Sequence, residues 1–301
     1  MTTMIDELFA KFEGAFAENT IRGYRHDFDQ FAKWCSNEGI HPLPAPSISI
    51  AAHIDALSET HKAASIRRRI NALSTVYKLG RMQDTTKDPD VTLAMKRMHR
   101  KLGRAQKQAK PLTKLYLDKM IEAQDDSPRG LRNKILLLMG YETMRRRSEL
   151  VGFEFSDVTC LLNGKPALRL KFSKADQYGE GRLIEISEEL LNLIKTWQKV
   201  VGQEGRILRS IDKHGNIGNK LEPSAISYIL RQAQENISLP GNKKPRQWTG
   251  HSFRVGAAVD LVERGYSIEQ VMRKGDWKTA QASIRYVMVE RLRNNLVPPS
   301  K

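Results

Sequence analysis

Apolar side chains recur at the spacing of amphipathic helices along the first hundred residues. The polar pair Asn19-Thr20 stands in front of one such segment and is expected to cap it. One face of this segment collects Ile21, Tyr24, Phe28 and Phe31. The pattern predicts a helix that buries this face against other elements of an N-terminal domain.

A second helix is predicted over about 63–79, where four apolar side chains point inward: Ile66, Ile70, Leu73 and Tyr77. The run Arg67-Arg68-Arg69 falls on its exposed side. Such a run either lines a DNA groove or forms a solvated basic face, and the pattern leaves both readings open.

A composition shift marks a domain boundary. The stretch from Lys96 to Lys110 contains seven basic residues and no acidic one, and its helical pattern fades into the polar segment 105–111, which Pro111 closes. We therefore predict two domains, residues 1–107 and 108–301.

The second domain begins with helix signals and continues with a strand pair. Thr113 precedes an apolar segment at 115–121, and Ser127-Pro128 precedes another at 131–139. Apolar and polar residues alternate over 167–172, and residues 182–186 form a second segment that can pair with them. This pattern predicts a β-hairpin. Ser187 is the predicted cap of a helix that carries Leu190, Leu191, Ile194 and Trp197, and the remainder is predicted to be helical with polar connections. The expected fold is mainly α with a small β-sheet in the C-terminal domain.

Charge narrows the class of partner. The formal net charge is +16, from 50 Lys and Arg residues against 34 Asp and Glu residues. This excess favours a polyanionic partner, since each basic side chain that neutralises a phosphate releases counterions. A solvated basic surface or a membrane-facing one gives the same total, so charge alone does not decide between them.

Other features of the sequence argue against a metal site, a disulfide framework, a signal peptide and a membrane-spanning segment. Cys35 and Cys160 form neither a metal-ligand spacing nor a disulfide framework, and Cys35 is predicted to be a buried small hydrophobe. Residues 1–7 lack the features of a signal peptide, and the apolar run Ile135–Met139 is far too short to cross a bilayer. We expect a cytoplasmic protein that uses no metal or other cofactor.

Two short motifs suit the binding of a phosphate. In the run Met144–Leu150, Arg146 and Glu149 are three residues apart and share one side of a helical turn. An arginine fork binds two phosphate oxygens, and a glutamate behind it holds the fork in place. A surface ion pair is the alternative, and three consecutive arginines leave the register open.

The second motif is His251-Ser252-Phe253-Arg254, which follows Trp248-Thr249-Gly250. The threonine and glycine predict a tight entry into a helix. His251 and Arg254 would then lie on one face near the N-terminus of that helix, where backbone N–H groups and the helix dipole favour an anion.

The order of these motifs resembles the tyrosine site-specific recombinase (phage integrase) family. It runs from R-x-x-E through a hairpin lysine, Lys174, to H-x-x-R, and then to Trp277 and Tyr286. The segment 248–258 and the nine-residue step from Trp277 to Tyr286 resemble the Cre-like branch of that family. The resemblance implies a helical core DNA-binding domain at 1–107 and a catalytic domain at 108–301.

Carried over to this chain, the resemblance implies DNA cleavage through a 3′-phosphotyrosyl intermediate. Tyr286 would be the nucleophile, and Arg146 and Arg254 would stabilise the pentavalent phosphate. Lys174 would be the general acid for the leaving 5′ oxygen, with Lys171 on the same hairpin as the alternative. The remaining expected site residues are Glu149, which would orient the site, His251, which would assist proton transfer, and Trp277, which would donate an indole hydrogen bond.

The implied partner is double-stranded DNA with an inverted-repeat site, and the implied reaction exchanges strands between two such sites without ATP or metal. Candidate DNA contacts are Arg22, Arg25, Arg67, Arg68, Lys243 and Lys244. The apolar tail at 287–301 would pack into a neighbouring protomer of a tetramer on two duplexes, or else fold back on its own domain. A bacterial, phage or plasmid context is expected.

Two other functions compete with recombination. A topoisomerase-like or hairpin-telomere-forming enzyme would use the same phosphotyrosine step, but a short two-domain chain without large additions argues against both. A non-catalytic DNA-binding protein that retains the fold is a competitor from another class. The presence of every expected catalytic residue argues against that one.

Overall fold

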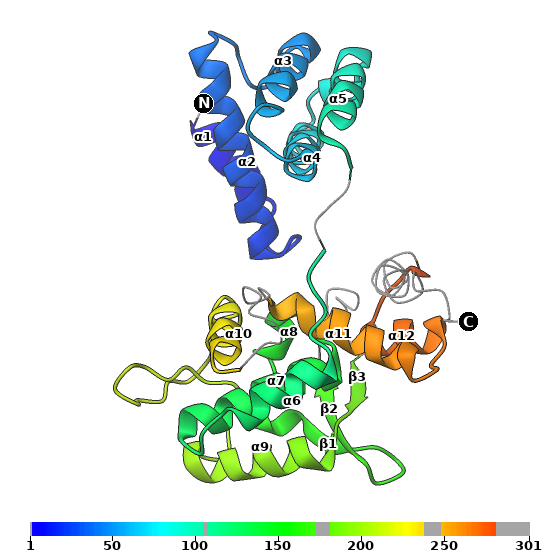
Figure 1. Cartoon of the computed structure of the whole chain (residues 1–301). Coiled ribbons are helices and arrows are strands. Elements are labelled where there is room, and N and C mark those ends of the chain that lie inside the picture. The colour runs from blue at the N-terminus through cyan, green and yellow to red at the C-terminus, as the bar shows by residue number, and fades with distance from the viewer. Residues whose placement is uncertain (1, 105–107, 172–180, 238–247, 281–301) are drawn as a thin grey trace, which may run out of the picture. The chain divides into compact units, whose positions relative to one another are not determined.

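The computed structural model describes residues 2–104, 108–171, 181–237 and 248–280. Its contacts divide the chain into two compact units, residues 1–107 and 108–301 (Figure 1). The first unit is helical throughout its described length, and the second adds a small sheet to its helices.

Over residues 2–104, the first unit contains five α-helices and one 3-10 turn. They are α1 (Thr2–Ala10), α2 (Glu18–Asn37), α3 (Ser47–Leu57), α4 (Ala63–Leu79), η1 (Thr85–Lys87) and α5 (Pro89–Leu102). Helix α2 packs on α4, and α3 packs on α5. Their apolar faces form one core around Phe28, Phe31, Ile54 and Ile66, none of which is more than 2% exposed. Burial of these faces is the main force that holds the helices together.

The predicted helix at 63–79 is confirmed, and its four expected inward side chains are buried. The predicted caps of the first helix expected from the sequence, which corresponds to α2, are wrong. Helix α2 begins at Glu18 with Ala17 at the N-cap, so Asn19 and Thr20 lie in its first turn. Most of the basic stretch that follows residue 96 belongs to α5, where Arg97 and Lys101 pair with acidic residues of the α3 region. The helix forms despite the repulsion between these like charges, because α5 packs on α3 and forms ion pairs with acidic residues there.

The second unit contains the elements that position the site. They are α6 (Lys114–Glu122), α7 (Pro128–Thr143), α8 (Arg147–Leu150), η2 (Phe155–Asp157), β1 (Val158–Cys160), β2 (Pro166–Leu170), β3 (Arg182–Glu185), α9 (Glu188–Val201), α10 (Ala225–Glu235), α11 (Gly250–Glu263) and α12 (Ile268–Gly275).

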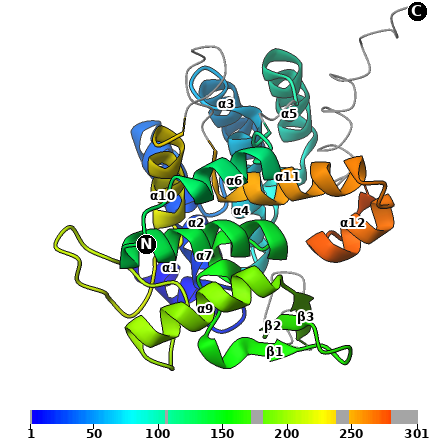
Figure 2. The same ribbon diagram turned by 60° about the horizontal axis from the view of Figure 1, so that its bottom comes forward.

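Helix α7 is the centre of this unit. It contacts α6, α8, α9, α11 and β3, and Figure 2 shows it between α9 and α11. Its run Ile135–Met139 is buried on every side, as the continuous apolar sequence requires. Ser127 caps α7 by accepting a hydrogen bond from Gly130 N, and Ser187 caps α9 in the same way, so both predicted caps are confirmed.

The predicted hairpin is confirmed as the antiparallel pair β2 and β3, with Leu168 opposite Ile184. A third strand, β1, pairs with the other edge of β2. The sequence did not predict β1, because three partly exposed residues carry no periodic signal. The sheet places the end of β2, and so Lys171, at the edge of the candidate site.

The sequence predicts helices with polar connections after α9, and residues 202–224 form a long connection of this kind before α10. The described backbone there forms turns and two isolated bridges, one of which pairs Ile211 with Ile217. Gly202, Gly205 and Gly215 all adopt positive φ values, which break a helix. Within the described residues, no helix is long and apolar enough to cross a membrane.

Candidate active site

The three consecutive arginines after α7 differ in burial and in hydrogen-bond partners. Helix α7 ends at Met144, a buried residue with a left-handed backbone (φ 53°) that turns the chain. The Arg145 side chain is fully buried. Arg146 faces the site, whereas Arg147 is exposed and donates to Ser227 Oγ at 3.3 Å. The structure therefore settles the register that the sequence left open.

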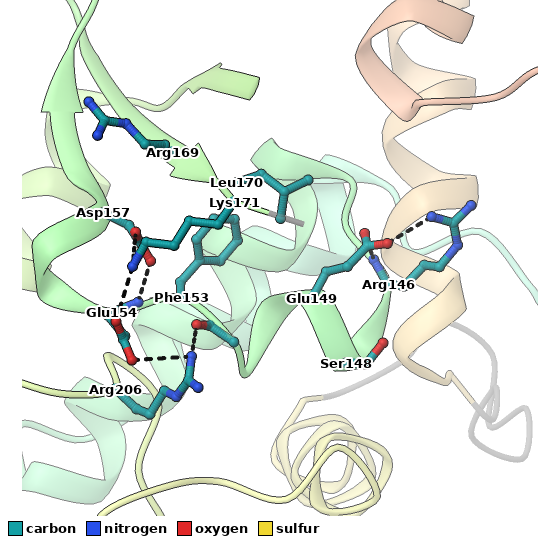
Figure 3. A pocket seen from close by; sticks show the side chains of 11 residues that line it. Arg146, Ser148, Glu149, Phe153, Glu154, Asp157, Arg169, Leu170, Lys171 and Arg206 are labelled. Carbon is teal, nitrogen blue, oxygen red and sulfur yellow. Dashed lines mark hydrogen bonds and ion pairs between the residues drawn. The ribbon is translucent and has the colours of Figure 1, made fainter. Parts of the chain in front are cut away.

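Arg146 and Glu149 form a double interaction at the start of α8. Glu149 Oε1 accepts from Arg146 Nη1 at 2.8 Å, and Oε2 accepts from Arg146 N at 3.0 Å (Figure 3). Burial alone would raise the pKa of Glu149, but the backbone N–H and guanidinium of Arg146, together with the charge of Arg145, lower it overall. Glu149 is therefore ionised at neutral pH and holds the Arg146 fork.

Helix α11 carries the second motif that suits the binding of a phosphate, His251–Arg254. Thr249 is its N-cap residue, and Ser252 Oγ accepts a hydrogen bond from Thr249 N at 3.0 Å. The helix is buried on most of its surface, so Arg254 is only 2% exposed. Arg254 donates from Nη1 to Met144 O at 2.5 Å and from Nη2 to Gly275 O at 2.7 Å.

Charge crowding lowers two pKa values in this motif. Burial, followed by the charges of Arg146 and Arg145, lowers the pKa of Arg254 to about 10, so it remains charged at neutral pH. Partial desolvation, followed by the charges of Arg254 and Arg146, lowers the pKa of His251 from its usual 6.5. His251 is exposed at the surface and neutral at pH 7, so its ring can either donate or accept a proton.

Trp277 joins this group from the end of α12. Ser267 caps that helix by accepting from Gln270 N, and Asp276 ends it with a left-handed backbone (φ 55°). The guanidinium carbon of Arg254 lies 5.1 Å from the centre of the Trp277 ring, which is a cation–π contact. Five of the seven expected site residues thus come together in one region: Arg146, Glu149, His251, Arg254 and Trp277.

An open cleft of about 500 Å³ extends from Arg146 toward the sheet. Figure 3 shows Arg146 and Glu149 at one end, with Phe153 and Leu170 between them and a second polar group at the other end. The cleft is lined by Arg146, Ser148, Glu149, Gly152, Phe153, Glu154, Asp157, Arg169, Leu170, Lys171 and Arg206.

Lys171 belongs to the second polar group. Its Nζ lies 2.9 Å from Asp157 Oδ1 and 3.1 Å from Glu154 Oε2, and Arg206 Nη1 lies 3.5 Å from Glu154 Oε1. These partners, Asp157 first and then Glu154, raise the pKa of Lys171. The ammonium group is therefore held away from the Arg146 end of the cleft.

The remaining predicted residues of the second unit lie outside the described residues. They are Lys174, Tyr286, Lys243 and Lys244. The tail at 287–301 lies outside them as well.

The four predicted DNA contacts of the first unit lie on α2 and α4. Arg22 and Arg67 are exposed. Arg25 pairs with Asp6 and sits 5.2 Å from the centre of the Phe9 ring, and Arg68 pairs with the buried Asp27. All four residues belong to the first unit, whereas Arg146 and the residues grouped with it belong to the second.

The assembled group is suited to an anion with a developing negative charge. Preorganised guanidinium and indole donors stabilise such a charge without reorganisation. The sequence did not predict that Arg145 and Asp276 belong to this region, although Nη1 of Arg145 and of Arg146 each lie 3.9 Å from Asp276 Oδ2. The only sequence signals for them were the extra arginine before Arg146 and the position of Asp276 next to Trp277. Within the described part of the chain, no cluster of three or more His, Cys, Asp or Glu side chains forms a metal site.

Comparison with known proteins gives two family matches. Residues 110–293 match the phage integrase family, and residues 8–81 match the phage integrase N-terminal SAM-like domain. The two matches fall on either side of the division between the units.

Individual relatives cover most of the chain. An integrase/recombinase xerD homolog from Selenomonas ruminantium is 27% identical over 92% of this chain and 83% of its own length. The recombinase cre of Escherichia phage P1 is 22% identical over 91% of this chain and 84% of its own length. A lambda integrase dimer bound to a COC′ core site shares the fold, with a TM-score of 0.63 and 16% identity over 95% of each chain. The chain belongs to the phage integrase family.

Proposed function

We propose that this protein is a tyrosine-type site-specific DNA recombinase that cleaves and rejoins DNA through a 3′-phosphotyrosyl intermediate. The observation that carries the proposal is the convergence of Arg146, Glu149, His251, Arg254 and Trp277 at one place in the second unit. Family membership supports it, since relatives named as tyrosine recombinases match 89% and 91% of this chain.

In the proposed reaction, the phenol oxygen of Tyr286 attacks the scissile phosphorus, and the bond from phosphorus to the 5′ oxygen breaks. Lys174 gives a proton to that leaving oxygen. His251 assists proton transfer by accepting the proton that the Tyr286 phenol loses, which its lowered pKa supports because the ring is neutral at pH 7. A 5′-hydroxyl from another strand then reverses the step, so the phosphoester energy is kept and no ATP is needed.

Charge stabilisation comes from the arginines. Arg146, held by Glu149, and Arg254, which stays charged, supply donors for the equatorial oxygens of the pentavalent phosphate. Trp277 would add its indole N–H. Each such preorganised donor is typically worth roughly 2.7–4 kcal/mol in the transition state.

The same proposal assigns roles to the two units. The first unit, residues 1–107, is a core DNA-binding domain, and the second, residues 108–301, is the catalytic domain. The target is an inverted-repeat duplex, and the tail at 287–301 joins neighbouring protomers in a tetramer on two duplexes. The integrase dimer on its core site, a protein of the same fold, supports assembly on DNA.

A suicide duplex tests the reaction. Inverted-repeat duplexes that bind the protein are selected from a randomised library and are then nicked beside the scissile phosphate, so that the freed 5′-hydroxyl fragment dissociates. We expect the wild-type protein to accumulate a covalent protein–DNA adduct on a denaturing gel. Tyr286→Phe should form no adduct and should still bind the duplex, because only the nucleophilic oxygen is lost.

The matched control is Tyr266→Phe, which removes the hydroxyl of a tyrosine that is 48% exposed in the connection between α11 and α12. This variant should form the adduct at the wild-type rate. An adduct formed by Tyr286→Phe would overturn the choice of nucleophile, and failure of the wild-type protein to form one on any bound duplex would overturn the reaction itself.

A further inference from the structure

Two helices end beside each other at the candidate site, and each ends in a left-handed residue other than glycine. These C-cap residues are Met144, directly after α7, and Asp276, directly after α12. The last carbonyl groups of a helix have no partner within the helix, and the helix dipole places partial negative charge there. Both helix ends therefore need donors, preferably cationic ones.

Two buried arginines supply these donors. Arg254 bridges the carbonyls of Met144 and Gly275, as described above. Arg145 bridges the preceding carbonyl of each helix: Nε donates to Thr143 O at 2.8 Å, and Nη2 donates to Lys274 O at 2.5 Å. Consecutive carbonyls of α7 are thereby joined to consecutive carbonyls of α12.

The third nitrogen of Arg145 faces a carboxylate. Its Nη1 lies 3.9 Å from Asp276 Oδ2, and no described residue accepts a hydrogen bond from it. The same carboxylate oxygen lies 3.9 Å from Arg146 Nη1. Arg145, Arg146 and Arg254 face the carboxylates of Glu149 and Asp276, so this group carries one net positive charge. A phosphodiester, with one negative charge, would balance it.

We propose that Arg145 is a positioning residue of the cleavage reaction, which holds the end of α12 and so Trp277 in place relative to Arg146, with Asp276 as its counterion. A buried ion pair is seldom more stabilising than well-packed apolar side chains. Arg145 is fully buried, and its Nη1 has no hydrogen-bond acceptor among the described residues. Such an arginine is better suited to positioning the elements around it than to stabilising the fold alone. This inference rests on the proposed function.

Single-turnover cleavage of the suicide duplex at saturating protein tests the role. Arg145→Met keeps the length of the side chain and removes its donors, and should lower the rate constant by about 10–100-fold, as small misplacements of reacting groups do. Arg145→Lys should recover part of the rate, and duplex affinity should stay near the wild-type value. Arg147→Met is the matched control, because Ser227 is the only hydrogen-bond partner of that exposed arginine among the described residues, and it should cleave at the wild-type rate.

Rate constant and amplitude separate positioning from simple loss of stability. A variant that is only less stable would give a smaller adduct amplitude with an unchanged rate constant, and that result would overturn the proposal. The double variant with Asp276→Asn adds a second criterion. Without Arg145, the Asp276 carboxylate is left near Arg146 and competes with the phosphate, so Asp276→Asn should raise the rate in the Arg145→Met background and lower it in the wild type. Additive effects would contradict the pairing.

Amide hydrogen exchange tests the positioning without any cleavage. Peptides that cover residues 268–280 should exchange faster in Arg145→Met than in wild type, whereas peptides from α9 should not change. Equal exchange in both proteins would overturn the proposal even if cleavage were slowed. If the wild-type protein formed no adduct, the proposed function would fail while the exchange data still decided the role of Arg145.

Discussion

At the residue scale, the contacts of Lys171, next to β2, limit its ability to give up a proton. The ammonium group of Lys171 is shared between Asp157 and Glu154, and these ion pairs raise its pKa. A general acid works best when its pKa lies near the working pH. The contacts of Lys171 therefore support Lys174 as the acid and give Lys171 the role of fixing the end of β2.

A change of leaving group tests this assignment. Lys174→Ala should slow cleavage of the ordinary duplex strongly, and a duplex with sulfur in place of the 5′ bridging oxygen should restore the rate, because a thiolate leaves without a proton. Lys171→Ala should show no such rescue, since its loss disturbs the hairpin and not the proton transfer. Cleavage rates on the two duplexes give the answer, and a sulfur-specific rescue of Lys171→Ala would reverse the assignment.

His53 in the first unit links stability to pH. It is 4% exposed and packs against Phe31 and Trp34, with ring centroids 5.1 and 4.7 Å apart. Burial, followed by the charges of Arg69 and His61, lowers its pKa to about 4. Between pH 6.5 and 4 the unfolded chain binds a proton at this position that the folded chain does not bind, so stability falls as the pH falls.

The expected contribution is about 2 kcal/mol of unfolding free energy lost between pH 7 and pH 5. Urea unfolding of wild type and His53→Gln at both pH values measures it. The variant, which cannot titrate, should lose less stability than the wild type over this interval by that amount. Equal losses in the two proteins would mean that His53 is protonated as easily in the folded state as in the unfolded one.

Local chemistry explains which residues of the site were predictable. The spacing of Arg146 and Glu149 is a property of one helical turn, and the structure forms that pair. The burial of Arg145 depends on the carbonyl of Lys274, which is 129 residues away in the sequence. The 3.9 Å approach of Asp276 to Arg145 is likewise a contact between residues far apart in the sequence. Neither contact has a signal within its own stretch of sequence.

At the element scale, the same distinction between local and distant causes holds. The sequence predicted α4 to the residue and the caps of α7 and α9, because periodicity and capping are local. It missed β1, which is held only by pairing with β2. It gave no bounds for the connection at 202–224, where three glycines have positive φ values.

The close approach of α11 to the segment before α6 is a further feature that sequence patterns do not reveal. A Cβ added to Gly256 would lie 1.8 Å from Leu112 O. Two hydrogen bonds hold this segment in place: Leu112 N donates to Ser252 O at 3.1 Å, and Trp248 Nε1 donates to Pro111 O at 3.0 Å. The backbone at Leu112 has no freedom to move away without breaking them.

Gly256→Ala should therefore destabilise the protein by about 1–3 kcal/mol, as overpacking in a filled interior does. Gly23→Ala is the matched control, because a Cβ there meets nothing within 4 Å and the residue lies inside α2. That change should stabilise by about 0.4–1 kcal/mol through the unfolded chain. Chemical unfolding of the three proteins measures both values, and a neutral Gly256→Ala would show that the segment can shift.

At the scale of the whole molecule, the large positive charge is not evenly available for DNA. Several basic residues of the first unit are paired with carboxylates, among them Arg25 with Asp6 and Arg97 with Asp55. Arg68 is tied to Asp27, whose side chain is fully buried. Arg67, its neighbour on α4, is exposed and makes no ion pair within the described part of the chain. The proposed DNA contacts of α4 therefore differ in how freely they can meet a phosphate.

Salt dependence of duplex binding separates the two kinds of arginine. Each phosphate contact contributes about 0.9 to the slope of log affinity against log salt, so the wild-type protein should bind far more weakly at 200 mM than at 50 mM salt. Arg67→Gln should reduce the magnitude of that slope by about 0.9, the value of one phosphate contact, because the glutamine carries no charge to pair with a phosphate. Arg68→Gln should reduce it less and should also lower thermal stability, since it leaves the buried carboxylate of Asp27 short of its partner. Equal slopes for wild type and Arg67→Gln would show that α4 does not face the DNA backbone through Arg67.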